Sequence, residues 1–299
     1  MILENKKKIL RNLYNNTIIN FVDKKIPQKG ALSKNGFKVY KGIIKQKNII
    51  QGKKNLIEKI VSSKKISNKL RKSNKLGDTI NFNDHLLYSE YLLEVFDSNV
   101  IDDIKAYLGN NLKLDHTYLS IFNTSNGLIQ DCGSSGLFHH DSVGHRIKMF
   151  IPINSEGTVN NPTIYIAGTN KTKWKNYDNS EKNGRIRIDN EILERNYKNA
   201  ENLGITGDDI LIFDTNGIHK GSYFPTKENR ILIQFEFSSN KSNLKGLVGP
   251  GTFYMSKTYF EKFKQLNLLR LNRVECKNDS IVHLGKAKRG VDSQLSEYI

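Results

Sequence analysis

The sequence contains very few cysteines and no long apolar run. Cys132 and Cys276 are the only cysteines among 299 residues, which excludes a disulfide framework and a zinc site built from thiolates. No apolar stretch approaches the roughly 20 residues that a membrane-spanning helix needs. The N-terminal MILENKKKIL lacks the apolar core and cleavage site of a secretory signal. We therefore expect a cytoplasmic protein without a membrane span.

Acidic residues are scarce in the N-terminal quarter. Residues 1–75 contain 21 Lys and Arg but only three acids, whereas residues 76–299 contain 26 basic and 27 acidic residues. Such a basic segment can attract a nucleic acid or another anionic surface, but a lysine-rich helical face in water explains the same pattern. The lysines are not clearly interleaved with aromatic residues that would stack on bases. A nucleic-acid-directed function is therefore an alternative hypothesis and not the first one.

Three regions differ in their pattern. We expect residues 1–75 to form a basic, partly helical segment that packs on or precedes the core. Residues 76–245 are expected to form the core, with a polar insertion at 170–206, and residues 246–299 a helical extension and tail. Two segments, 84–108 and 250–270, have the pattern of helices; in the first, apolar residues recur at three- and four-residue steps.

From about residue 112 to residue 238 the apolar pattern changes to period two, which is typical of strands. The candidate strands are 112–122, 136–141, 146–153, 163–168, 208–214 and 230–237, and 36–40 alternates like a short strand. Many short strands without regular intervening helices favour a jelly roll or barrel over a βαβ sheet. The predicted fold is therefore mainly β with flanking helices (α+β).

The segment Gly136–Asp141 carries the most informative residues. Residues i and i+2 of a strand point to the same side, so His139 and Asp141 can direct an imidazole and a carboxylate at one point while His140 faces away. A third ligand has to come from a distant strand. His219 is the best candidate, because it follows the apolar run 209–214 and a turn, and precedes another strand.

Two histidines and one carboxylate leave adjacent coordination positions of a metal open. This arrangement suits non-haem Fe(II), which must accept a bidentate co-substrate and O₂ together. Zinc hydrolases use a different spacing, such as a helical HExxH, and no such motif occurs here. Arg230 lies eleven residues after His219 at the start of a predicted strand. Its guanidinium can grip a carboxylate in a bidentate manner, as the far end of 2-oxoglutarate requires.

Taken together, these motifs resemble the phytanoyl-CoA dioxygenase-like family. The resemblance covers about residues 30–238 and is strongest over 136–235. It is carried by Leu32–Tyr40, Phe138-His139-x-Asp141, Arg146–Ile153, Tyr165–Lys171, Gly207–Asp214, His219-x-Gly221 and Arg230. The resemblance implies a double-stranded β-helix (jelly roll, cupin-like) core. It also implies Fe(II) bound by His139, Asp141 and His219 as the catalytic centre, and 2-oxoglutarate bound by Arg230.

Three further residues are candidates for contact with the co-substrate. Phe150 falls near the family's aromatic residue at that place, Lys148 shares its side of the strand by period two, and Tyr118 could line the pocket, although core packing explains it as well. The sequence departs from the family at Gly221, where Ser or Thr is frequent, and at Asn170, where the family has His.

The resemblance implies oxidation of a small-molecule substrate with O₂, releasing succinate and CO₂. Asp141 favours hydroxylation over halogenation, because halogenases of this class have Gly or Ala there; desaturation and cyclisation stay open. A small metabolite or an acyl- or sugar-linked molecule is the expected substrate, and Trp174, Arg185 and Arg187 are candidates for a lid. A jelly-roll binding module without catalysis is the other alternative. No sequence pattern indicates the oligomeric state.

Overall fold

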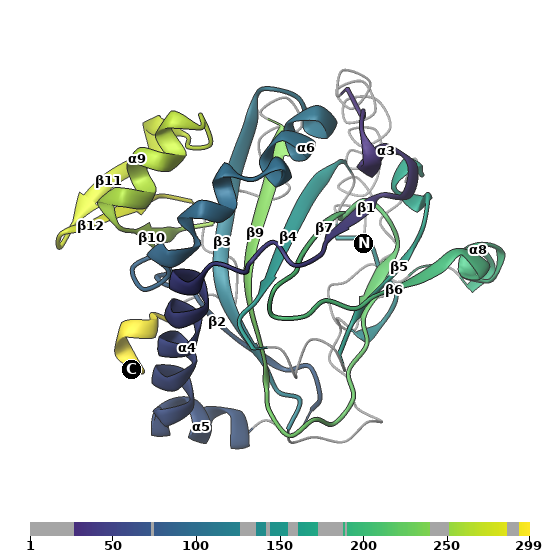
Figure 1. The fold of residues 1–299 in the computed structure, drawn as a ribbon. Coiled ribbons are helices and arrows are strands. Elements are labelled where there is room, and N and C mark those ends of the chain that lie inside the picture. The colour runs from purple at the N-terminus through teal and green to yellow at the C-terminus, as the bar shows by residue number, and fades with distance from the viewer. Residues whose placement is uncertain are drawn as a thin grey trace, which may run out of the picture.

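The computed structural model describes residues 27–72, 75–125, 136–141, 144–154, 161–172, 188, 190–239, 251–285 and 293–299. Its largest element is a six-stranded antiparallel sheet with the order β1-β7-β4-β9-β3-β2 (Figure 1). The strands of this sheet are β1 (Phe37–Tyr40), β2 (Thr79–Phe82), β3 (Leu112–Phe122), β4 (Arg146–Pro152), β7 (Ile210–Asp214) and β9 (Arg230–Ser239). The strands predicted over 36–40, 112–122, 146–153, 208–214 and 230–237 are confirmed, whereas β2 was not predicted. β1 adds the N-terminal region to the sheet.

A smaller sheet has the order β6-β5-β8. Its strands are β5 (Thr163–Ile166), β6 (Ala200–Leu203) and β8 (His219–Gly221), so the predicted insertion supplies β6. The prediction of a strand over 136–141 is wrong, because the pairing there is limited to one isolated antiparallel bridge between His139 and His219. This bridge nevertheless holds the segment against the free edge of β8.

The two sheets face one another across an interior whose contents follow from strand alternation. Tyr165 and Leu203 of the small sheet share a buried cluster with Phe150, Phe213 and Leu232 of the large sheet. On β9, the residues of the other parity belong to a second cluster beneath the helices: Ile231, Ile233, Phe235 and Phe237. Both faces of β9 are buried, which explains its nearly continuous apolar sequence.

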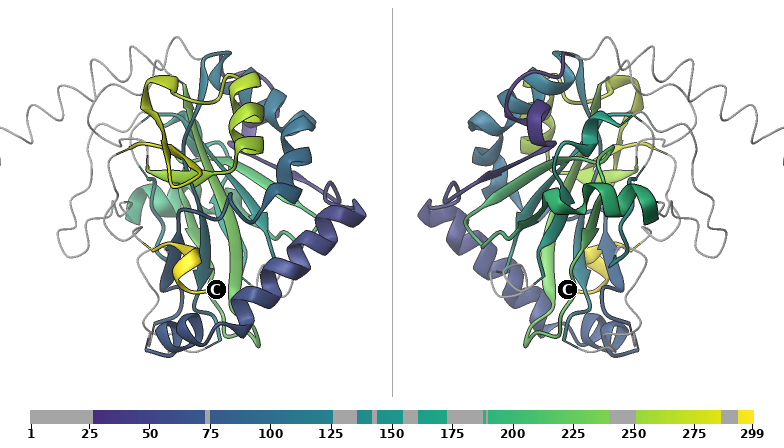
Figure 2. Two further views of the ribbon diagram at one scale, coloured as in Figure 1. Left: turned by 90° about the vertical axis from the view of Figure 1, so that its left-hand side faces the viewer. Right: turned by 90° about the vertical axis from the view of Figure 1, so that its right-hand side faces the viewer.

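Helices cover the outer face of the large sheet (Figures 1 and 2). The elements on this side are α4 (Lys47–Ser62), η2 (Glu90–Asp97), α6 (Asn99–Leu108) and α9 (Lys257–Gln265). The helix predicted over 84–108 is divided, because Ser98 begins a new helix and accepts a hydrogen bond from the Val100 N–H at 3.4 Å. Phe96 of η2 packs against both β9 and α9. The centroid of its ring is 5.1 Å from that of Phe235 and 4.9 Å from that of Phe263.

The remaining elements lie at the periphery. They are α3 (Ala31–Asn35), α5 (Lys64–Arg71), η5 (Thr169–Lys171), α8 (Asn190–Asn196), η6 (Tyr197–Asn199), β10 (Phe253–Met255), η7 (Leu271–Arg273), β11 (Val274–Lys277), β12 (Ser280–His283) and η8 (Leu295–Glu297). A third sheet has the order β10-β12-β11. The helix predicted over 250–270 is therefore only α9, preceded by the short strand β10.

The basic helices α4 and α5 are attached to the body of the protein. Their apolar residues, among them Leu56 and Ile60, belong to the cluster beneath the sheet. Lys65 donates to the carbonyl of Glu297 at 2.6 Å, and Lys69 donates to the Tyr298 hydroxyl at 3.0 Å. Some of the lysines thus hold the C-terminal segment, and an anionic partner for residues 1–75 stays a prediction. Within the described ranges, no helix is long and apolar enough to cross a bilayer.

Candidate metal centre

His139, Asp141 and His219 converge at the edge of the small sheet. One potential ligand atom from each residue lies within 4.8 Å of the other two. Asp141 Oδ1 is 3.5 Å from His139 Nε2 and 3.9 Å from His219 Nε2. His140, the neighbour in sequence, is buried and is not part of this group. The alternation of side chains along a strand predicted His139, and not His140, as the ligand. The structure groups His139 with Asp141 and His219, although the segment forms only a single bridge.

Backbone hydrogen bonds fix the two imidazoles. The His139 N–H donates to the His219 carbonyl at 2.9 Å, and the His219 N–H donates to the His139 carbonyl at 2.8 Å. Each Nδ1 faces the carbonyl two residues earlier, Leu137 at 2.6 Å and Gly217 at 2.9 Å. A carbonyl only accepts, so Nδ1 carries the hydrogen and Nε2 keeps its lone pair for a metal.

Asp141 is held as a carboxylate. Its backbone N–H donates to the Thr215 carbonyl at 3.0 Å, and its Oδ2 pairs with the Lys148 ammonium. Burial alone would raise the pKa of Asp141, but Lys148 and the two imidazoles outweigh it and keep this pKa well below the ordinary range. Burial, together with His139, lowers the pKa of His219 to about 3. Two imidazoles and one carboxylate are a donor set that fits a divalent transition metal.

Arg230 is a buried cation without a carboxylate partner among the residues that the structure describes. The residue is 2% exposed, and its guanidinium lies 5.3 Å from the centroid of the Phe122 ring. Its Nε and Nη2 have no hydrogen-bond partner in the part of the chain that the structure describes. Burial lowers the pKa of Arg230 to about 10, so the group is still charged at neutral pH. Because an unpaired buried charge is costly, this position fits an anionic ligand.

Tyr223 lies beside Arg230 and was not predicted as a site residue. Its ring stacks on Phe122 with centroids 5.9 Å apart. A Cβ at Gly221 would lie 2.6 Å from the Tyr223 hydroxyl oxygen, so the ring occupies the space that a side chain at 221 would need. The sequence signal was Gly221 itself, where the family resemblance leads one to expect Ser or Thr.

The three other candidates for co-substrate contact occupy different places. Lys148 pairs with Asp141, and Phe150 packs edge-on against Phe213 with centroids 5.1 Å apart. Tyr118 stacks on His116 with centroids 5.4 Å apart. Lys148 and Phe150 therefore lie toward the metal ligands, since the Phe213 ring is also 5.1 Å from the His219 ring. A role for Lys148, Phe150 or Tyr118 in binding a co-substrate stays a prediction.

A row of ionisable side chains extends from the candidate ligands along the inner face of the large sheet. His116, Glu236 and Lys148 lie directly opposite one another on β3, β9 and β4. One oxygen of Glu236 is 3.2 Å from His116 Nε2, and the other pairs with Arg146. Since Lys148 also reaches Asp141, this part of the interior is strongly polar.

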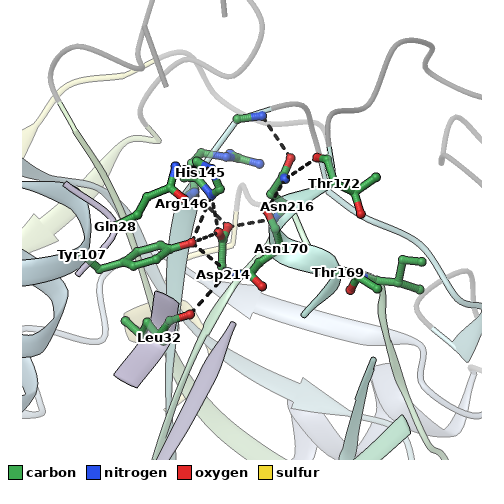
Figure 3. A network of polar contacts seen from close by, with 12 residues as sticks. Gln28, Leu32, Tyr107, His145, Arg146, Thr169, Asn170, Thr172, Asp214 and Asn216 are labelled. Carbon is green, nitrogen blue, oxygen red and sulfur yellow. Dashed lines mark hydrogen bonds and ion pairs between the residues drawn. The ribbon is translucent and has the colours of Figure 1, made fainter. Parts of the chain in front are cut away.

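A second polar cluster lies behind the ligands, where β7 ends (Figure 3). Tyr107 Oη donates to Asp214 Oδ2 at 2.7 Å, and His145 Nδ1 is 2.5 Å from the same oxygen. Asn170 Nδ2 donates to Tyr107 Oη at 3.1 Å, and Asn216 Nδ2 donates to the Asn170 carbonyl at 2.8 Å. Asn170, one of the two departures from the family pattern, is thus part of this network. The predicted lid residues Trp174, Arg185 and Arg187 lie outside the described residues.

No protein-family model matches the chain, and no curated protein matches it in sequence. Solved structures are similar in fold. EctD from S. alaskensis, in its apoform, has a TM-score of 0.51 and 13% identity over 74% of this chain and 80% of EctD. SnoN, a non-heme alpha ketoglutarate dependent epimerase from nogalamycin biosynthesis, has a TM-score of 0.49 and 10% identity over 74% and 83% of the two chains.

HygX from Streptomyces hygroscopicus, solved with nickel, 2-oxoglutarate and hygromycin B, has a TM-score of 0.45 and 11% identity over 70% of this chain and 85% of HygX. Of these three structures, EctD alone has a TM-score above 0.5, and at 13% identity this likeness shows a common fold. The predicted mainly β fold with flanking helices and a double-stranded β-helix core is thereby confirmed.

Proposed function

We propose that the chain is an Fe(II)- and 2-oxoglutarate-dependent oxygenase. The observation that carries this proposal is the combination, in one interior, of a His–Asp–His group with the donor set of a divalent metal and the buried guanidinium of Arg230, whose Nε and Nη2 have no hydrogen-bond partner among the described residues. A metal site alone would fit many chemistries. The additional requirement for a buried anion favours a keto acid that chelates the metal at one end and reaches Arg230 at the other.

In this proposal His139, Asp141 and His219 would hold the iron and leave coordination positions for the co-substrate and O₂. Arg230 binds the distal carboxylate of 2-oxoglutarate, and the Phe122 ring holds the guanidinium in place. With O₂, the loaded centre would supply the oxidant for a C–H bond of the substrate, with release of succinate and CO₂. The carboxylate at 141 occupies the position that a halide would need, so hydroxylation is favoured over halogenation.

The inner wall narrows the class of substrate. An acyl chain beside Lys148 and Asp141, which are partly exposed, would separate these charges from water without offering them hydrogen bonds, which is unfavourable. A small hydrophilic molecule or a sugar-linked one can exchange hydrogen bonds with the same groups. We therefore place hydrophilic metabolites ahead of acyl-linked ones among the candidate substrates.

The test uses the full chain reconstituted with Fe(II), ascorbate and O₂. We expect binding of 2-oxoglutarate and slow, uncoupled formation of succinate even without the substrate, both lost in His219→Ala. Addition of hydrophilic metabolites should accelerate succinate formation more than addition of acyl thioesters. If neither 2-oxoglutarate binding nor succinate formation is detected, a non-catalytic binding module becomes the better hypothesis.

A further inference from the structure

The turn that joins β7 to β8 supplies backbone acceptors to two of the three candidate ligands. The carbonyl of Thr215 accepts the Asp141 N–H at 3.0 Å, and the carbonyl of Gly217 accepts His219 Nδ1–H at 2.9 Å. A shift of this turn would therefore move the Asp141 carboxylate and rotate the His219 imidazole together. The position of this turn therefore affects the geometry of the candidate metal site.

Asp214 holds both ends of this turn. Its carboxylate oxygen Oδ1 accepts the backbone N–H of Asn216 at 2.9 Å, and its carbonyl accepts the N–H of Gly217 at 3.1 Å. The Tyr165 hydroxyl donates to the same carbonyl at 2.9 Å. Asp214 is fully buried, so these bonds do not compete with water.

The carboxylate of Asp214 is itself anchored to two other elements, as Figure 3 shows. Oδ2 accepts from Tyr107 of α6 at 2.7 Å and lies 2.5 Å from His145 Nδ1, immediately before β4. Oδ1 is also 3.3 Å from the backbone nitrogen of Arg146, which donates to it. A helix, a strand of the large sheet and the ligand-bearing turn therefore meet at one carboxylate.

We infer that Asp214 is a positioning residue for the metal centre, acting through the turn and not by contact with the metal. The inference rests on the proposed function. Hydrogen bonds to an ionised acceptor are roughly twice as strong as neutral ones. An amide in place of the carboxylate presents an NH₂ group to neighbours that also donate, so at least one of the present bonds is lost whichever way the amide turns.

Asp209, at the other end of β7, provides a matched control. It is also buried, and it accepts hydrogen bonds from the Gly42 N–H at 2.9 Å, the Thr206 N–H at 2.8 Å and the Lys41 ammonium at 3.0 Å. These bonds hold the start of β7 and have no connection to the turn at 215–218. Asp209→Asn and Asp214→Asn thus make the same chemical change at the two ends of one strand.

The experiment measures Mn(II) affinity of the full chain by electron paramagnetic resonance of the free ion, alongside urea unfolding of the metal-free protein. We expect both variants to be less stable. Asp214→Asn should also weaken Mn(II) binding by about 10- to 100-fold, the usual effect of losing a partner that orients metal ligands, whereas Asp209→Asn should leave it unchanged. Tyr107→Phe, which removes one donor and keeps the ring, should weaken Mn(II) binding in the same direction and less.

Equal Mn(II) affinity of both Asn variants, whether weakened or not, would overturn the inference while leaving the proposed function intact. If Asp214→Asn does not fold, Tyr107→Phe decides the question, and an unchanged affinity of that variant counts against the role. Wild-type protein that binds no Mn(II) would overturn the proposed function, and this inference with it.

Discussion

Replacing Arg230 by Met should change stability and ligand binding in opposite directions. The buried guanidinium has its pKa lowered from 12.5 to about 10. A folded-state pKa below the ordinary value means that folding disfavours the charged form, here by on the order of 3 kcal/mol at neutral pH. Met fills a similar volume without a charge. Loss of the contact with Phe122 subtracts ~0.5–1 kcal/mol, so we expect Arg230→Met to be about 2 kcal/mol more stable when no 2-oxoglutarate is present.

Under the proposed function, the same substitution also removes the partner of the distal carboxylate of 2-oxoglutarate. Truncating one member of a buried charge pair costs ~2–5 kcal/mol, which corresponds to a roughly 30- to 4,000-fold weaker 2-oxoglutarate affinity. Excess 2-oxoglutarate should therefore raise the free energy of unfolding of metal-loaded wild type by about 2.7 kcal/mol at 100 times the wild-type Kd, and that of Arg230→Met by less than about 1 kcal/mol at the same concentration.

Arg146 is the control, because it is a buried arginine that does have a partner. Arg146→Met would leave the Glu236 carboxylate, which it now pairs with, short of its main cation. We expect destabilisation of about 3 kcal/mol, within the range for a broken buried pair. Urea unfolding of the three proteins, with and without Mn(II) and 2-oxoglutarate, measures both effects. An Arg230→Met variant that is less stable than wild type, or that keeps its 2-oxoglutarate affinity, would refute the reasoning.

Three further substitutions test other parts of the structure. Tyr223→Phe keeps the ring but removes the hydroxyl beside Arg230; calorimetry should show 2-oxoglutarate binding about tenfold weaker, and unchanged binding would mean that the hydroxyl does not reach the ligand. Burial lowers the pKa of His85 to about 3, so the unfolded chain takes up the proton first as pH falls below about 6.5, and stability is lost from there down to about pH 3. Urea unfolding at pH 7 and pH 5 should therefore show about 2 kcal/mol more loss for wild type than for His85→Gln, and equal losses would contradict this. Phe96→Ala should cost ~3–5 kcal/mol in urea unfolding with unchanged Mn(II) affinity, whereas a change in that affinity would show that the helix layer affects the site.

The sequence predicted the large sheet well and its surroundings less well. β3, β4, β7 and β9 lie where strands were predicted, and each is buried on both faces, with one face in the interior and one beneath the helices. The single helix predicted over 84–108 was wrong, because the segment contains two helices, η2 and α6. Apolar spacing of three and four residues fits a 3₁₀ helix followed by an α-helix as well as one long helix, and only the cap at Ser98 separates the two.

Some residues of the candidate site could be predicted from the sequence and others could not. Residues with a local pattern, such as His139 and Asp141, could be selected from spacing, and the structure brings them to His219. Tyr223 and the pairing of Lys148 with Asp141 could not be foreseen. Both depend on how distant segments approach one another, and neither leaves a periodic signal in the sequence.

The bridge between His139 and His219 has a consequence for the dynamics of the chain. Two reciprocal backbone hydrogen bonds join segments 80 residues apart, and a metal held by both side chains would close the same loop a second time. Opening of the bridge would then require release of the metal. The amide hydrogens of these two histidines should exchange with solvent slowly in metal-loaded protein and faster after chelation, so their exchange rates would report occupancy of the centre without any measurement of turnover.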